Sequence, residues 1–543
     1  MESVVTVLIL LLAVVLSGPL ARLSRLPLPL VQIALGAAIA CSVLDTVELD
    51  PDLFFLLFLP PLLFLDGWRM PKDGLRRDAP VILELALGLV AFTVLGVGLF
   101  VHFLIPMVPL PVAFALAAVV SPTDPIAVKA IAARVPIPKR MMRILEGEAL
   151  LNDASGLVCL RFAVAAALTG SFSVGAAFGT FLWLAIGGIA IGAAVTLCIA
   201  RVERWIGAHL GEDVGTPILI SLLIPFGAYL LAEAAHCSGV LAAVAAGIAM
   251  TFTERAGEGR AVTRVQRTAV WDMVQMAANG MIFVLLGEQM PDILERTDRT
   301  VRMTGHVDAW WLGAYVLAIA AALAALRFAW VWTSLRLTLF RAGRRGEKPP
   351  KVSWHLVAAI SLAGVKGAVT LAAVLTLPLT LQGGAPFPAR DLAIFLAAGV
   401  ILVSLLAASA FLPGLMRNLT LPPDPSAQAD LDRARAQAAR VAILAIENAR
   451  REMAEGHEDA DLIVETSLRI KALHRPRIDN EPQDEAAAAQ KHKVEKIEKQ
   501  LRLVGLRAER TEIFRLMQAR ELGDEAARKI IREIDLLEAR YTI

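Results

Sequence analysis

The sequence contains few cysteines and almost no net charge. Its four cysteines lie in or beside apolar segments without metal-ligand spacing, so we interpret them as small packed side chains and expect no disulfide framework. They are Cys41, Cys159, Cys198 and Cys237. The formal net charge is +2 over 543 residues, which indicates no particular soluble partner, and we expect no nucleic-acid binding. The residues before Val4 lack basic side chains, so the first apolar run is expected to be a retained span rather than a signal peptide.

Long apolar runs dominate the chain, and 57% of its residues are hydrophobic. This distribution predicts an all-α polytopic membrane protein surrounded by the lipid bilayer. About thirteen segments have the ~20-residue length that a membrane crossing requires. They are residues 3–19, 27–44, 53–68, 80–106, 111–133, 144–168, 174–200, 215–235, 237–253, 269–290, 308–335, 354–378 and 389–414.

Lysine and arginine are concentrated in alternate connections between these segments. Basic connections remain on the cytoplasmic side of a membrane, and the richest of them are residues 69–77, 134–143, 255–267 and 341–351. The other set of connections contains only Arg296, Arg299, Arg302 and Arg390. The alternation predicts an N-terminus outside and a C-terminus inside, which requires an odd number of spans.

The composition changes abruptly after the proline-rich stretch 422–425. We expect a transmembrane domain at residues 1–421 and a cytoplasmic, charged, alanine-rich tail at residues 422–543. Apolar residues at helical spacing predict tail helices near 428–455, 459–472, 484–519 and 523–540. A small soluble bundle and a coiled-coil dimer are both compatible with this pattern, and a regulatory sensor is a further alternative.

Three carboxylates, Glu146, Glu148 and Asp153, lie in the sixth apolar segment. A charge at the centre of a spanning helix costs roughly 2.5–3.5 kcal/mol, so such residues usually face a partner or a water-filled path. Asp153 is roughly 14 Å from the cytoplasmic end of its segment at 1.5 Å per residue, which is near mid-depth. We predict that Asp153 carries a proton and a monovalent cation alternately.

Two interruptions are expected in other apolar segments. Pro122 and Pro125 remove backbone donors and disfavour helical geometry at the residues before them, so the fifth segment should break around Asp124. Gly364 and Gly367 flank Lys366 in the twelfth segment and predict a second break. The loop charges give these two segments opposite directions, as an inverted-topology repeat would produce.

Broken helices expose backbone carbonyl groups at mid-depth, where transporters coordinate ions. Hard monovalent cations prefer oxygen ligands. The candidate ligands are therefore Asp153, Asp124, the hydroxyl or carbonyl oxygen of Thr123, and Ser155. Lys366 is expected to lie among the ends of the broken helices and to stabilise the place where the two interrupted segments cross.

Several stretches together resemble the monovalent cation:proton antiporter-1 family, which comprises bacterial NhaP-type and eukaryotic NHE-type sodium/proton exchangers. They are 58–67 (FLPPLLFLDG), 121–125 (SPTDP), 146–153 (EGEALLND), 232–233 (AE) with 238–239 (SG), and 364–368 (GVKGA). The resemblance covers the whole membrane region. Each stretch is weak evidence alone, but the combination is specific.

The resemblance implies a homodimer in a bacterial inner membrane, with a static dimerisation part and a mobile core in each thirteen-helix protomer. It implies that Asp153 carries the ion, usually Na⁺, or the proton, and that Asn152 and Asp124 shape the site. It also implies exchange of one cation for one proton without a cofactor. Family members pair the glutamate before the Asn-Asp dipeptide with an arginine, which here predicts an ion pair between Glu148 and Arg327 at matching depth.

Two positions depart from the family pattern. Ala149 replaces a serine found in many members, and Lys366 replaces the usual arginine. These differences leave the choice among Na⁺, K⁺ and Li⁺ open. Asp66 is expected either to line an inner ion funnel or to meet lipid headgroups. Arg161 is expected to have an internal partner that the sequence does not identify.

The preferred hypothesis is a secondary active transporter that is not an enzyme. A passive cation channel is one alternative. An intramembrane aspartyl protease is a remote one, because such enzymes carry a Gly-x-Gly-Asp stretch that is absent at Asp124 and Asp153. A signalling receptor that uses the tail is another.

Overall fold

The computed structural model is predominantly helical in the residues that it describes. These residues are 2–41, 51–70, 72–125, 128–129, 139–169, 174–210, 214–255, 261–295, 297–302, 304, 308–344, 354–381, 385–417, 425–454, 460–475, 485–519, 521–522 and 524–542. Within them, the β-structure consists of one isolated bridge between Thr380 and Pro386. The predicted all-α class is therefore confirmed.

Eight helical stretches among the described residues are long and apolar enough to cross a membrane. They comprise α1 (Glu2–Ser24), the continuous α4 (Lys72–Leu83), η1 (Glu84–Leu89) and α5 (Val90–Leu104), α8 (Lys139–Thr169), α9 (Val174–Leu210), α10 (Gly215–Ala234), α12 (Ala261–Glu288), α15 (Trp310–Arg344) and α18 (Arg390–Arg417). The η1 segment is π-helical. Apolar side chains such as Leu8, Trp183 and Leu223 remain exposed on these helices, as expected where helices face lipid.

Shorter helices occupy the remaining apolar segments. They are α2 (Leu28–Ala40), α3 (Pro51–Arg69), α6 (Leu110–Val120), α11 (Gly239–Arg255), α16 (Trp354–Leu362) and α17 (Ala368–Leu375), with α13 (Met290–Glu295) and α14 (Thr297–Arg302) following α12. Every predicted apolar segment thus contains a helix. The number of helices that cross a bilayer remains a prediction.

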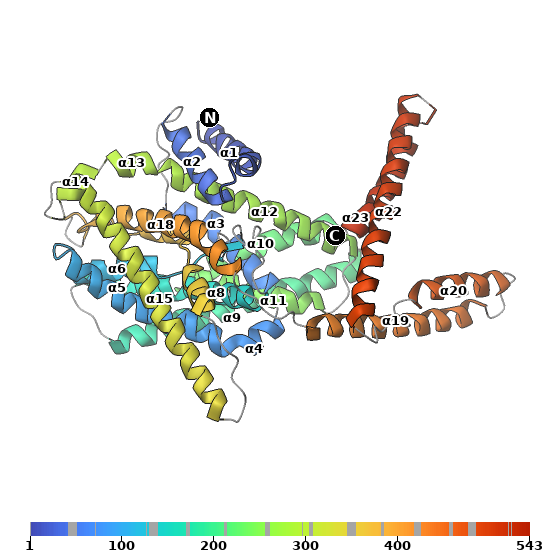
Figure 1. Ribbon diagram of the computed structural model, residues 1–543, viewed down its shortest axis with the longest axis horizontal. Coiled ribbons are helices and arrows are strands. Elements are labelled where there is room, and N and C mark those ends of the chain that lie inside the picture. The colour runs from blue at the N-terminus through green and yellow to red at the C-terminus, as the bar shows by residue number, and fades with distance from the viewer. Residues whose placement is uncertain are drawn as a thin grey trace. The chain divides into compact units, whose positions relative to one another are not determined.

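Contacts divide the membrane helices into two groups, most of whose members are labelled in Figure 1. The first group, which we call the α3/α12 group, contains α1, α2, α3, α9, α10, α11 and α12. The second, the α6/α8 group, contains α4, η1, α5, α6, α8 and α15 to α18. The two groups meet where α3 and α12 contact α17 and where α3 and α11 contact α8. The site described below lies at this junction.

Small residues permit the closest helix contacts within the α3/α12 group. A Cβ atom on Gly36 of α2 would lie 1.9 Å from the carbonyl oxygen of Val284 on α12. Gly287 of α12 approaches the carbonyl oxygen of Ile33 equally closely. Close backbone approach of this kind drives helix association in lipid, where burial of apolar surface gives little advantage.

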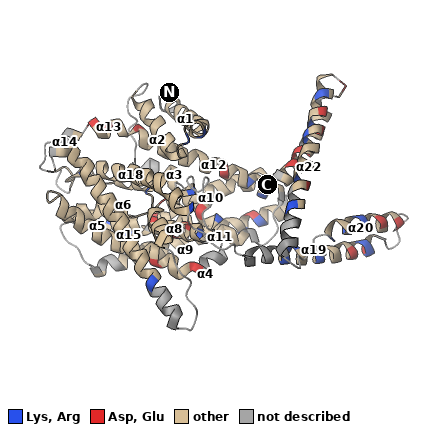
Figure 2. Ribbon diagram, in the orientation of Figure 1, with Lys and Arg blue, Asp and Glu red and all other residues tan. Residues whose placement is uncertain are grey.

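The chain divides into two compact units, Met1–Leu421 and Pro422–Ile543. In the second unit α19 (Pro425–Ala454) packs on α20 (Ala460–His474), and α22 (Glu485–Gln518) packs on α23 (Asp524–Thr542). These helices match the four predicted tail segments, and Figure 2 shows both charge signs spread along them. Arg510 of α22 forms ion pairs with Asp535 and Glu538 of α23. The Arg510 guanidinium lowers the pKa of the Glu538 carboxyl group.

Candidate functional site

Two interrupted helices of the α6/α8 group cross where this group meets the α3/α12 group. Helix α6 ends at Val120, and the chain is non-helical from Ser121 to Asp124; α16 ends at Leu362, and α17 begins at Ala368. Both predicted breaks are confirmed. The backbone N–H of Asp124 donates to the carbonyl oxygen of Val365 at 2.8 Å, which joins one interruption to the other.

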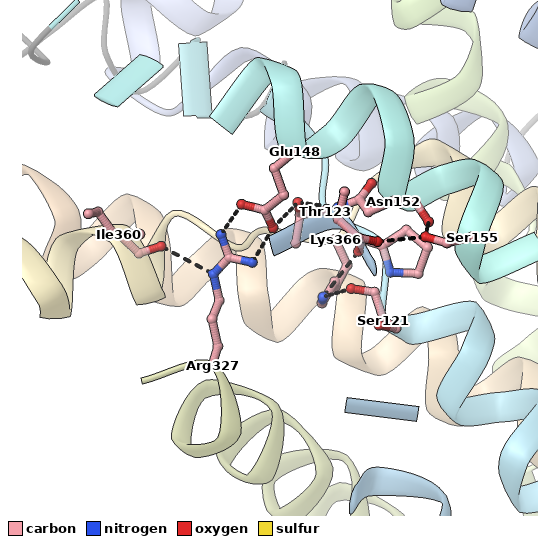
Figure 3. A network of polar contacts seen from close by, with 10 residues as sticks. Ser121, Thr123, Glu148, Asn152, Ser155, Arg327, Ile360 and Lys366 are labelled. Carbon is pink, nitrogen blue, oxygen red and sulfur yellow. Dashed lines mark hydrogen bonds and ion pairs between the residues drawn. The ribbon is translucent and has the colours of Figure 1, made fainter. Parts of the chain in front are cut away.

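Lys366 provides a second connection between the interruptions. Its ammonium group donates to the carbonyl oxygens of Ser121 at 2.8 Å and Pro122 at 3.1 Å (Figure 3). These carbonyl groups follow the C-terminal end of α6, where the helix dipole is negative and favours a cation. The backbone N–H of Lys366 donates to Ser404 Oγ of α18 at 3.0 Å. The lysine therefore satisfies backbone groups that the break leaves without helical partners.

Gly367 allows the two interruptions to approach each other. A Cβ atom there would lie 1.9 Å from Asp124 Oδ2 and 2.4 Å from Asp124 Cβ and Cγ. We expect Gly367→Ala to displace Asp124 and to reduce to background, in inverted membrane vesicles, the cation–proton exchange that the family resemblance predicts. Gly414→Ala is the control, because no atom lies within 4 Å of the added methyl group. Equal exchange by the two variants would contradict the close approach of Gly367 to Asp124.

Glu148 and Arg327 form a buried, two-pronged ion pair. Arg327 Nη1 and Nη2 lie 2.5 and 2.8 Å from the two carboxylate oxygens of Glu148. Arg327 is 5% exposed and Glu148 is 1% exposed. Arg327 Nε also donates to the carbonyl oxygen of Ile360 at 3.2 Å. The pair therefore connects α8, α15 and α16 next to the crossing (Figure 3).

A hydrogen-bond chain extends from this ion pair toward the crossing. Thr123 Oγ1 donates to Glu148 Oε1 at 3.2 Å and accepts from Asn152 Nδ2 at 2.8 Å. The hydroxyl group of Thr123 is thus fixed by both neighbours. Asn152 Oδ1 is buried without a hydrogen-bond partner among the described residues. This series of hydrogen bonds orients the non-helical segment that carries Asp124.

A cavity of about 50 Å³ lies beside the crossing and contains Asp153 in its wall. Its polar lining residues come from both helix groups: Asp66, Thr123, Asp124, Asp153, Asn279 and Thr370. The volume accommodates a small ion with one water molecule, since each water takes up about 30 Å³ in the liquid. No described residue hydrogen-bonds or forms an ion pair with the Asp153 carboxylate, so its oxygens are available to a ligand.

The predicted site residues divide between this cavity and its surroundings. Asp153, Asp124, Thr123 and Asp66 line it, and Ala149 contributes a methyl group to its wall. Ser155 is outside the lining, and its hydroxyl group donates to the carbonyl oxygen of Ala86 in η1 at 2.7 Å. Asn152 also lies outside the lining, one hydrogen bond from Thr123.

Asn279 and Thr370 were not recognised from the sequence, although both contribute polar side chains to the cavity. Asn279 interrupts an apolar part of α12 between Ala278 and Gly280, and that isolated amide was an available signal. Thr370 lies one helical turn beyond Gly367, so it shares a face with the crossing.

No three His, Cys, Asp or Glu residues in the described part of the chain are close enough to hold one metal ion together. A cation in the cavity would therefore need hydroxyl, amide, carbonyl or water oxygens in addition to the carboxylates. This donor set suits a hard monovalent cation that binds and leaves, because oxygen ligands are the ones hard cations prefer.

Two further charged residues of α8 have partners outside the cavity. Glu146 pairs with Lys129 at 2.9 Å. Arg161 pairs with Glu233 of α10 at 3.2 Å, and Glu233 also accepts the backbone N–H of Gly239. This pair identifies the partner of Arg161, and it joins the α6/α8 group to the α3/α12 group.

Comparisons with known proteins agree with this arrangement. The transmembrane sodium/hydrogen exchanger family matches residues 7–417. An uncharacterised Na⁺/H⁺ exchanger of Escherichia coli K12, YjcE, is 42% identical over 99% of each chain. A sodium, potassium, lithium and rubidium/H⁺ antiporter of Bacillus pumilus is 38% identical over the full chain and 78% of that relative.

The fold is similar to a solved structure at lower identity. The sodium/proton antiporter MjNhaP1 of Methanocaldococcus jannaschii matches with a TM-score of 0.58 and 21% identity, covering 77% of this chain and 99% of that one. This likeness supports the fold, and the sequence matches support the family. The chain belongs to the sodium/hydrogen exchanger family of membrane antiporters.

Proposed function

We propose that this chain exchanges a monovalent cation for a proton at the Asp153 cavity. The observation that carries the proposal is the position of an unbonded carboxylate in a small cavity between two helix groups. Asp153 belongs to the α6/α8 group, whereas Asp66 and Asn279 belong to the α3/α12 group. Movement of one group against the other would change the exit of the cavity, as alternating access requires.

Coupling follows from competition for one carboxylate. When Asp153 holds a cation or a proton, its negative charge is compensated and the site can move through the low-dielectric interior. When Asp153 is empty, the charge opposes that movement. A proton released to one side is therefore replaced by a cation taken from that side.

Asp124 differs from Asp153 in its surroundings. Asp124 lies against Gly367 at the N-terminus of α17, where the helix dipole stabilises a negative charge. Asp153 lies inside α8, away from a helix N-terminus, and accepts no hydrogen bond from a described residue. We infer that Asp124 remains ionised and that Asp153 alone alternates, which gives one proton for each monovalent cation.

The expected cation range is broad. The Bacillus relative named above takes sodium, potassium, lithium and rubidium, and the cavity wall here presents the methyl group of Ala149. A methyl group supplies no oxygen whose fixed position would favour one ion radius. We propose that this chain likewise accepts several alkali cations.

The proposed setting is a homodimer in a bacterial plasma membrane. The basic connections support an extracellular N-terminus and a cytoplasmic tail. In this setting residues 1–421 form the membrane domain that carries out the exchange, and residues 422–543 form the cytoplasmic unit.

Inverted membrane vesicles test the function directly. Addition of Na⁺, K⁺, Li⁺ or Rb⁺ to respiring vesicles should dissipate an established pH gradient, whereas choline should not. Vesicles from cells without the protein provide the background. Cation uptake that proceeds without proton movement would support a passive channel and would contradict the proposed exchange.

A further inference from the structure

A second cavity lies on the other side of Lys366. Its volume is about 270 Å³, close to the lower limit of roughly 300 Å³ for small-molecule sites. Most of its wall is apolar and comes from α15 and α18, including Leu317, Ala321, Ala324, Val403 and Ala407. It shares none of its lining with the Asp153 cavity. The proposed exchange uses no part of this space.

The lining of the second cavity includes hydrogen-bond donors. Thr93 and Ser121 are 5% and 6% exposed, and both line it. No described residue hydrogen-bonds with either hydroxyl group, although buried polar groups normally have partners. The Lys366 ammonium group has three donors, and the described residues accept two of them. The cavity lining therefore contains three donors that no described residue accepts.

The ionisable side chains in the cavity lining are all basic. Arg327 and Lys366 are the ionisable residues in the lining, and no carboxylate belongs to it. Glu148 neutralises Arg327 from outside the cavity. Lys366 lines this cavity together with the two hydroxyl groups and without a carboxylate, so the lining favours a negatively charged hydrogen-bond acceptor.

An exposed groove adjoins the apolar part of the cavity. A groove of about 660 Å³ shares Ala324, Ser361 and Leu362 with it. The outer walls of this groove include Trp354 and Phe411, which are 57% and 64% exposed. A chain entering between α15, α16 and α18 would meet apolar side chains until it reached the donors.

We propose that this cavity and groove bind a single-chain anionic amphiphile from the membrane, such as a fatty acid anion. The head would accept hydrogen bonds from Lys366, Thr93 and Ser121, and the acyl chain would leave along the groove past Trp354. The site lies outside the Asp153 cavity, and its test measures binding without transport, so a failure of the proposed exchange would leave it untouched.

Tryptophan quenching by a brominated amphiphile tests the site in the full-length protein in lipid nanodiscs. At pH 8, ω-bromododecanoate should quench fluorescence saturably, and Trp354→Phe should remove that saturable component. The neutral ω-bromododecanol should require about tenfold higher concentration, since a hydrogen bond to a charged group contributes roughly that factor. Thr93→Val should weaken dodecanoate binding by about the same factor and leave dodecanol binding unchanged.

A neighbouring pair of substitutions provides the matched control. Ala324→Phe places a ring where the cavity and the groove meet and should abolish saturable quenching. Ala325→Phe adds the same ring at a position that lines neither space and should leave quenching intact. Equal binding of the anion and the alcohol, or equal behaviour of the two phenylalanine variants, would overturn the proposal.

Discussion

Replacing Asp153 with asparagine is expected to abolish cation-induced proton movement. The amide is nearly the same size as the carboxyl group, so the cavity should keep its shape. It cannot, however, take up and release a proton or compensate a cation's charge. We expect a rate at least roughly a hundredfold below that of the unaltered protein, which corresponds to about 2.7 kcal/mol in the barrier. Inverted vesicles with Na⁺ or K⁺ provide the measurement.

The control for this substitution is Asp308→Asn. Asp308 is an exposed carboxylate outside the cavity, so exchange should remain close to that of the unaltered protein. Thermal unfolding of both purified variants should show that loss of exchange at Asp153 is not loss of fold. Substantial exchange by a folded Asp153→Asn variant would exclude the proposed carrier role.

Removal of one partner from the Glu148–Arg327 pair is expected to have the largest effect on stability. Arg327→Met should leave the buried Glu148 carboxylate without its cation and lower the free energy of unfolding by about 3–5 kcal/mol. The double variant Glu148→Leu with Arg327→Met should recover much of that loss, because both charges are then absent. Denaturant or thermal unfolding in detergent measures the difference.

The exposed interhelix pair Arg161–Glu233 provides a matched comparison. Its side chains are 55% and 34% exposed, so water already solvates both charges. Arg161→Gln should therefore change stability by only about 0–1 kcal/mol. Two results would show that burial does not determine the stability effect of the pair. One is that Arg327→Met is no more destabilising than Arg161→Gln. The other is that the double variant is less stable than either single variant at the buried pair.

The sequence allowed the helical class and both interruptions to be predicted because each has a local physical cause. Long apolar runs require helices in lipid, and Pro122 with Pro125 cannot continue a helix. Carboxylates in an apolar segment are too costly to be incidental, which singled out Asp153 and Glu148. The contact between Glu148 and Arg327 was predicted from the family resemblance together with the matching depth of the two residues.

The composition of the cavity could not be predicted in the same way, because it depends on contacts between distant helices. Asn279 joins Asp153 only through the packing of α12 beside α17. The direction of Ser155 is set by the π-helical segment η1, which presents the Ala86 carbonyl oxygen. No residue pattern in that segment indicated the change of helix type.

The crossing has a consequence for the membrane potential. Lys366 and Asp124 contribute opposite charges there, and Glu148 and Arg327 neutralise each other beside it. A loaded Asp153, with either a cation or a proton, adds no net charge to this set. Each elementary charge carried through 100 mV would involve about 2.3 kcal/mol of electrical work. On the proposed mechanism both loaded forms cross without such work, so the concentration gradients of cation and proton drive exchange even when the membrane is fully depolarised.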